Sequence, residues 1–143
     1  MFAPNPGEGA RPLARIASGG ELSRLLLAVK RVLADREPVA TYLFDEVDAG
    51  VSGEAARRVA AAIRDVARHH QVICVTHLPA VAAQGDHHLE VEKVEDAGRT
   101  ITRARTLDHD GRIDAIARLV GGIEAGAKAR AAAADLLRRA REE

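Results

Sequence analysis

Two adjacent carboxylates, Asp45 and Glu46, follow the short apolar run Thr41–Phe44. The run is β-prone, so it predicts a strand whose end presents both acids. In an α/β fold the carboxyl end of a parallel sheet is the edge that binds ligands. Asp45 suits Mg²⁺, a hard cation that prefers oxygen ligands, and Glu46 could orient or deprotonate an attacking water. The alternative is a solvated strand end before a turn, and this segment alone does not decide between them.

A second segment, Ser18-Gly19-Gly20-Glu21, stands at the start of a predicted helix. Ser18 and Glu21 have the spacing of a capping box, so Ser18 should begin the helix. Unpaired backbone N–H groups and two small glycines would let the helix start approach an anion such as the γ-phosphate of a nucleotide. Taken alone, the segment favours a plain capped helix. The helix should end at Pro38 and has an apolar face formed by Leu22, Leu25, Leu26, Val29 and Leu33.

The third segment is the apolar run Gln71–Thr76, which is followed by His77. An apolar run without alternation predicts a buried strand. If this strand neighbours Thr41–Phe44, then His77 and Glu46 lie at the same edge of the sheet. A histidine there could donate a hydrogen bond to a phosphate or to a polarised water. Taken alone, an ordinary loop histidine is the better interpretation.

The pattern of helices and strands expected around these residues predicts an α/β fold. A helix over 52–69, with Ala56, Val59, Ala60, Ile63 and Val66 inward, links the two strands and predicts a βαβ unit with parallel strands. Further along we expect a short helix over 80–84, a hairpin of strands 87–94 and 100–107 joined at 96–98, a helix over 113–120, a break at Gly121-Gly122 and a final helix.

Composition excludes several classes of protein. The chain of 143 residues has 21 Lys+Arg and 21 Asp+Glu, so no net charge attracts nucleic acid, and 2% aromatics argue against a base-stacking platform. A single cysteine, Cys74, excludes a disulfide framework and fits a reducing compartment. No apolar stretch is long enough to span a bilayer, and the first residues do not form a secretory signal. We therefore expect a cytoplasmic protein of one domain that does not contact membranes.

Together the three segments resemble the ABC-type ATPases. Ser18-Gly19-Gly20-Glu21 is similar to the signature motif, Leu43-Phe44-Asp45-Glu46 to Walker B, Val47–Ser52 to the D-loop, and His77 to the switch histidine. The amino-acid sequences of the segments Leu13–Arg24, Phe44–Gly53 and Thr76–Ala82 resemble more particularly those of RecN, an SMC-like family of bacterial DNA repair proteins. The resemblance runs from about Pro4 to the last helix.

The resemblance implies a role for each matching residue. Ser18, Gly19, Gly20 and Glu21 would contact ATP bound to a second head, with Ser18 and Gly20 at its γ-phosphate. Asp45 would serve Mg²⁺, Glu46 the attacking water, and His77 would sense the γ-phosphate. Asp48, Gly50 and Ser52 fall in the D-loop, where Ser52 departs from the aspartate of many ABC proteins.

One essential part of such a head is absent from the sequence. A P-loop needs a Gly-Lys pair, yet Lys30, Lys93 and Lys128 follow Val29, Glu92 and Ala127. The resemblance implies that the P-loop lies in an N-terminal segment beyond a coiled coil, so residues 1–143 would be the C-terminal segment of the head. We expect the isolated chain to be inactive, and to be poorly soluble or to co-purify with that segment, because its sheet would be uncovered.

By this resemblance the function is ATP hydrolysis coupled to DNA double-strand-break repair. ATP would be sandwiched between two heads in an ATP-dependent homodimer, with DNA bound by the full-length protein at the nucleoid. A transporter-type ABC subunit is an alternative, although Asp45-Glu46-Val47-Asp48 is not the sequence that is common at this position in transporters. A non-catalytic nucleotide or DNA clamp is another, and the presence of both Glu46 and His77 argues against it.

Two other groups of residues could bind ligands. The pairs His69-His70 and His87-His88 suggest a metal, but adjacent side chains diverge and no further ligand has suitable spacing, so structural roles are expected. The basic residues Lys128, Arg130, Arg138, Arg139 and Arg141 of the last helix could contact DNA phosphates, although an ordinary basic helix end is the simpler interpretation.

Overall fold

The acidic strand end lies in a βαβ unit. In the computed structural model, which describes residues 19–96 and 98–142, β1 (Thr41–Phe44), α2 (Gly53–Ala67) and β2 (Gln71–Cys74) follow one another. The strands pair in parallel, with Thr41 opposite Gln71 and Phe44 opposite Cys74. The predicted parallel pair is confirmed, and both strands end at one edge of the sheet.

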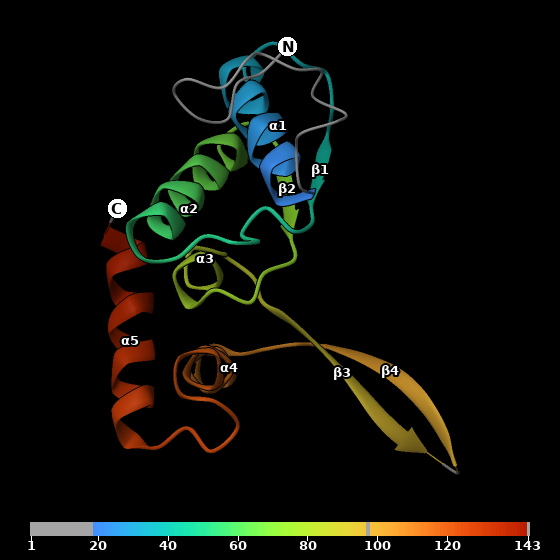
Figure 1. Cartoon of the computed structure of the whole chain (residues 1–143), viewed down its shortest axis with the longest axis vertical. Coiled ribbons are helices and arrows are strands. Elements are labelled where there is room, and N and C mark those ends of the chain that lie inside the picture. Colours follow the sequence, from blue (N-terminus) through green and yellow to red (C-terminus); the bar gives the residue numbers. More distant parts are fainter. Residues whose placement is uncertain (1–18, 97, 143) are drawn as a thin grey trace, which may run out of the picture. The chain divides into compact units, whose positions relative to one another are not determined.

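The chain divides into two compact units, Met1–Thr76 and His77–Glu143. The first unit holds the βαβ elements and α1 (Gly19–Leu33). The second holds α3 (Pro79–Ala82), β3 (Leu89–Asp96), β4 (Arg99–Thr106), α4 (His109–Gly121) and α5 (Ala127–Glu142) (Figure 1). Among the described residues, none of the helices has the length and apolar character needed to cross a membrane.

The two helices of the first unit differ in what they bury. The buried residues of α2 are Ala56, Val59, Ala60, Ile63 and Val66, the five that the sequence places inward. In α1, Leu27 is buried, whereas Leu22, Leu26 and Val29 of the predicted apolar face are about half exposed. The helix ends at Leu33 rather than at Pro38, because the amides of Arg36 and Glu37 turn back onto the Leu33 carbonyl at 2.9 and 3.2 Å.

The sheet of the first unit is more exposed than the sequence predicts. β2 ends at Cys74, not Thr76, and Leu43, Ile73 and Val75 are exposed to 67%, 46% and 55%. Leu43 and Ile73 are register partners and Val75 lies two residues further on, so the three share one face. The prediction of a buried strand is therefore wrong for the described residues, because two strands and the helices packed on them leave this face uncovered.

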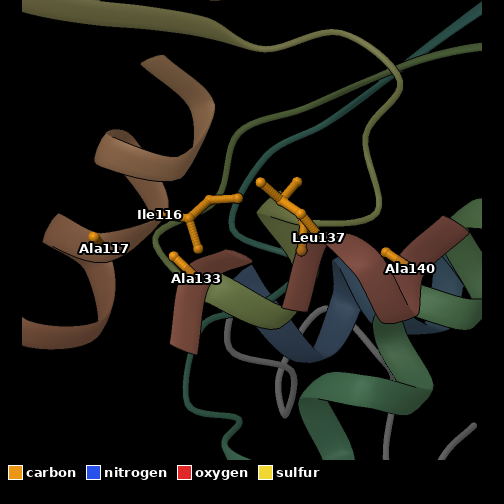
Figure 2. Packing of buried hydrophobic residues seen from close by; sticks show 6 residues of the cluster. Ile116, Ala117, Ala133, Leu137 and Ala140 are labelled. Atoms are coloured by element: carbon orange, nitrogen blue, oxygen red, sulfur yellow. The ribbon is translucent and has the colours of Figure 1, made fainter. Parts of the chain in front are cut away.

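The second unit has a helical core of its own. α4 and α5 contribute Ile116, Ala117, Ala133, Leu137 and Ala140, and Ala83 joins them from the end of α3. Figure 2 shows Ile116 directed toward α5, beside Ala133 and Leu137. α4 begins at His109, before the predicted Ile113, because the Asp108 side chain caps it by accepting the Gly111 N–H at 2.8 Å. It ends before Gly122, whose φ is 82°.

The predicted hairpin is confirmed, with its strands shifted toward the turn. Asp96 pairs with Arg99, and Gly98, which lies between them in the chain, has a φ of 76°. Glu90 lies opposite Arg105, and their side chains form an ion pair of 2.6 Å. Arg118 of α4 also pairs with Glu90 and ties the hairpin to the helix.

Candidate active site at the carboxyl edge of β1

The two acids emerge directly from β1. Phe44, the last residue of the strand, is buried, whereas Asp45 and Glu46 are exposed. The Glu46 N–H donates to Asp45 Oδ1 at 2.9 Å, and the Ser23 hydroxyl of α1 donates to the Asp45 carbonyl at 3.1 Å. The first bond holds the Asp45 carboxylate against the backbone of Glu46, and the second holds the backbone of Asp45 against α1.

Glu46 has a strained backbone. Its φ of 56° places a non-glycine residue in the left-handed region, the only such case among the described residues. The carbonyl of Glu46 accepts the Ala49 N–H at 3.0 Å, which closes a tight turn after the strand. Such strain persists where the surroundings fix it, and it is concentrated at functional sites.

The start of α1 packs against this turn. A Cβ added at Gly19 would lie 2.6 Å from Glu46 Oε2, and one added at Gly20 would lie 2.8 Å from Ala49 Cβ. A side chain at Gly20 would collide with Ala49, whereas at Gly19 only the end of the Glu46 side chain lies in the way, so the two glycines allow a close approach of the helix start. Here they approach the Glu46 turn of their own chain. Glu21 is exposed, and Ser18, with its predicted cap, lies outside the described residues.

Sequence reasoning missed two side chains of α1 that reach the same place. Besides Ser23, Arg24 Nη1 donates to the Ala49 carbonyl at 2.7 Å. A signal was available, because Ser23 and Arg24 lie four residues after Gly19 and Gly20 and so share their face of the helix.

The predicted D-loop residues have different surroundings. Asp48 is only 2% exposed and accepts a hydrogen bond from the Thr76 hydroxyl at the end of the β2 segment. Gly50 is exposed with a φ of 72°, a conformation that favours glycine. Ser52 is the N-cap residue of α2 by its backbone, and its side chain makes no cap hydrogen bond.

The third predicted motif follows β2. The Val75 N–H donates to the Phe44 carbonyl at 2.9 Å, which extends the pairing of the strand ends by one bond. Thr76 closes the first unit, and His77 is the exposed first residue of the second. The proximity of His77 to Glu46 stays a prediction.

Burial and the two nearby acids dominate the chemistry of Cys74. Burial, followed by the charges of Asp48 and Asp45, raises the pKa of the Cys74 thiol to about 11. The thiol is therefore protonated at neutral pH, and Cys74 is unsuited to act as a nucleophile.

The donor set at this edge fits part of a Mg²⁺ site. Asp45 and Glu46 supply exposed carboxylate oxygens on consecutive residues. No group of three or more His, Cys, Asp or Glu in the described ranges could hold a metal ion by itself. Mg²⁺ commonly retains waters and takes phosphate oxygens beside one or two carboxylates, so this partial set is compatible with a nucleotide-bound ion.

Several of the other candidate ligands make contacts within the chain. His70 lies with both ring nitrogens 2.6 Å from carbonyl oxygens, those of Val39 and Ala34. In α5, Arg138 and Arg139 form ion pairs with Asp135, and Arg130 pairs with Asp114 of α4. These contacts favour the structural interpretation of both the histidine pair and the basic helix.

The fold has a counterpart among solved structures. A structure from work on ATP-driven dimerization and DNA-stimulated activation of SMC ATPases aligns with a TM-score of 0.52 and 24% identity, over 76% of this chain and 64% of that chain. The fold is therefore similar to that of an SMC ATPase. In this chain it consists of parallel strands with flanking helices, the hairpin and the C-terminal helices.

Sequence comparison gives a more particular likeness, although no family model matches. DNA repair protein RecN of Streptomyces coelicolor is 49% identical over 99% of this chain and 25% of its own length. RecN of Halalkalibacterium halodurans is 46% identical over 84% of this chain and 21% of its own length. RecN of Bacillus subtilis is 41% identical over 98% of this chain and 24% of its own length. The chain is thus related to RecN, and it spans about a quarter of these relatives, in a C-terminal segment.

Proposed function

We infer that residues 1–143 form the C-terminal segment of an ATP-hydrolysing head in an SMC-like DNA double-strand-break repair protein. The observation that carries this proposal is the packing of the Gly19-Gly20 helix start against the strained Glu46 turn at the end of β1. One edge of the chain thereby presents both a helix N-terminus and two carboxylates. That combination suits a nucleotide held between two heads, with Mg²⁺ among its phosphates.

Each residue that the sequence predicts for the site has a proposed role. Asp45 binds Mg²⁺, which neutralises the charge of the phosphates, and Glu46 orients or deprotonates the attacking water. His77 donates a hydrogen bond to the γ-phosphate. The segment Ser18–Glu21 contacts ATP on the second head. Asp48, Gly50 and Ser52 shape the loop that faces that head.

The partner of this segment is an N-terminal segment that carries the P-loop. The chain has no Gly-Lys pair of its own, so it lacks the usual grip on the β- and γ-phosphates. The exposed face of Leu43, Ile73 and Val75 supports the proposal, because parallel sheets are normally covered on both faces. Alone, the chain is expected to be inactive.

A DNA repair role follows from the relatives rather than from the site. RecN proteins are DNA repair proteins, and a role in repair at the nucleoid is proposed for the complete protein from which this segment would come. The transporter-type alternative has no observation in its favour here.

Replacing Glu46 tests the catalytic role. In the chain combined with the P-loop segment, Glu46→Gln is expected to reduce turnover about 10²–10⁴-fold, because a positioned general base contributes that much. ATP affinity should persist. Glu54→Gln is the matched control, since Glu54 is an exposed acid on α2 that pairs with Arg58 at 3.5 Å. Unchanged turnover in Glu46→Gln would remove Glu46 from the mechanism and favour a non-catalytic clamp.

A further inference from the structure

Asp48 is the only buried charged residue among the described positions, with 2% of its surface exposed. A carboxylate is costly to remove from water unless hydrogen bonds compensate it. Asp48 receives such a bond from the hydroxyl of Thr76, 28 residues further along the chain. This contact ties the loop after β1 to the segment that follows β2.

The loop anchored by Asp48 is also the loop that carries Glu46. The Glu46 carbonyl accepts the Ala49 N–H at 3.0 Å, and the Asp48 carbonyl accepts the Val51 N–H at 3.3 Å, so Asp48 lies inside two consecutive turns. Arg24 holds Ala49 from the side of α1 at 2.7 Å. The left-handed backbone of Glu46 is therefore bounded by Phe44 of the strand on one side and by the Asp48 anchor on the other.

We propose that Asp48 is a positioning residue, which acts through its hydrogen bond with Thr76 to fix the Glu46 turn at the end of β1. The inference rests on the proposed hydrolytic role of Glu46 and deepens it. It assigns Asp48 a role within its own chain, distinct from contact with a second head. Thr76 directly precedes His77, so the same bond also fixes the point at which the chain continues to that residue.

The first test uses the isolated chain and amide hydrogen exchange. Thr76→Val keeps the shape of the side chain and removes the hydroxyl, so the amides of Ala49 and Val51 should exchange faster. Thr76→Ser keeps a hydroxyl and should restore protection. Thr41→Val is the matched control: the Thr41 hydroxyl joins β1 to β2 by a 2.9 Å bond to Gln71 at the opposite end of the strands. Unchanged exchange at Ala49 and Val51 in Thr76→Val overturns the anchoring role.

The second test uses the chain combined with its P-loop segment. Thr76→Val and Asp48→Ala, each of which removes the hydrogen bond between the two side chains, are expected to lower kcat about tenfold or more with little change in KM for ATP, because a small misplacement of a catalytic group is costly. The double variant should lose no more than the worse single variant, since both changes break one contact. Thr76→Ser and Thr41→Val should retain turnover.

The outcomes separate the two proposals. If the wild-type complex hydrolyses ATP and Thr76→Val does so at the same kcat, only the positioning role is overturned. A rise in KM together with a fall in kcat also overturns the positioning role, because ATP binding would then be impaired as well. Additive losses of kcat in the double variant overturn it too, because they would mean that the two residues act independently. If the wild-type complex is inactive, the proposed hydrolytic function fails, and the positioning role fails with it.

Discussion

The two compact units of the chain bury their apolar side chains to different extents. In the second unit, α4 and α5 enclose Ile116 completely around a core shared with α3. In the first unit, α2 has a buried face, but the sheet it accompanies leaves Leu43 and Ile73 open on one side. The parallel sheet with the acidic strand end is therefore left without a second covering layer. The helices of the second unit complete their core among themselves.

Replacing one buried and one exposed isoleucine by alanine tests the difference between the two units most strongly. Ile116→Ala should cost about 2–5 kcal/mol of stability, because it opens a cavity in a closed core. Ile73→Ala, at a site 46% exposed, should cost less than about 1 kcal/mol in the isolated chain. Urea denaturation followed by circular dichroism measures both. Equal losses of stability in the two variants would contradict the difference between the units. A larger loss of stability in Ile73→Ala after addition of the P-loop segment would show that this segment covers the exposed face of the sheet.

The two glycines of α1 offer a smaller contrast within the first unit. Gly20→Ala should destabilise the chain by about 1–3 kcal/mol, because the new Cβ meets Ala49 Cβ at 2.8 Å and its carbonyl at 3.0 Å. Gly19→Ala meets only the end of the Glu46 side chain, which can turn away, and alanine favours the helix, so its effect should stay within about 1 kcal/mol. Thermal unfolding of both variants checks this, and a more stable Gly20→Ala would show that α1 does not rest on the Ala49 turn.

The smallest expected effect is the pH dependence of the second unit. Burial and then the charge of Arg112 lower the pKa of His88, with Glu90 opposing, and its Nδ1 is buried without a hydrogen-bond partner among the described residues. The unfolded chain therefore binds the proton more readily. The contribution of His88 to stability is complete above about pH 6.5 and declines as the pH falls toward the lowered pKa.

Urea midpoints between about pH 5 and 7.5 measure this slope. His88→Gln should flatten it, and His87→Gln, which changes an exposed neighbour, should not. The same slope in His88→Gln and wild type would assign the pH dependence to another group.

The sequence predicted the parts of the fold that depend on local pattern. The inward face of α2 follows from helical spacing, and the parallel strands follow from the order of elements with short connections. The hairpin and its turn follow from Asp96 and Gly98 between two β-prone runs. The helix face and the hairpin depend on residues close together in the sequence, and the parallel pair depends on the order and short connections of a βαβ unit.

Features that depend on distant contacts could not be predicted. The exposure of Ile73 depends on which layers cover the sheet. A continuous apolar run predicts a buried strand whether or not the covering segment is present in the chain. The partnership of Asp48 with Thr76 joins residues on different elements, and nothing in either local segment signals it. The two glycines of α1 predicted a close approach to an anion, but not that the helix start would rest on the Glu46 turn of its own chain.

The most direct test of the central claim is ATP hydrolysis by this chain alone and after addition of the P-loop segment in trans. The account predicts no turnover by the chain alone, turnover on mixing, and loss of that turnover with Glu46→Gln. Turnover by the purified chain alone that survives Glu46→Gln would contradict it, because the phosphates would then be held, and the water activated, by groups other than those at the carboxyl edge of β1.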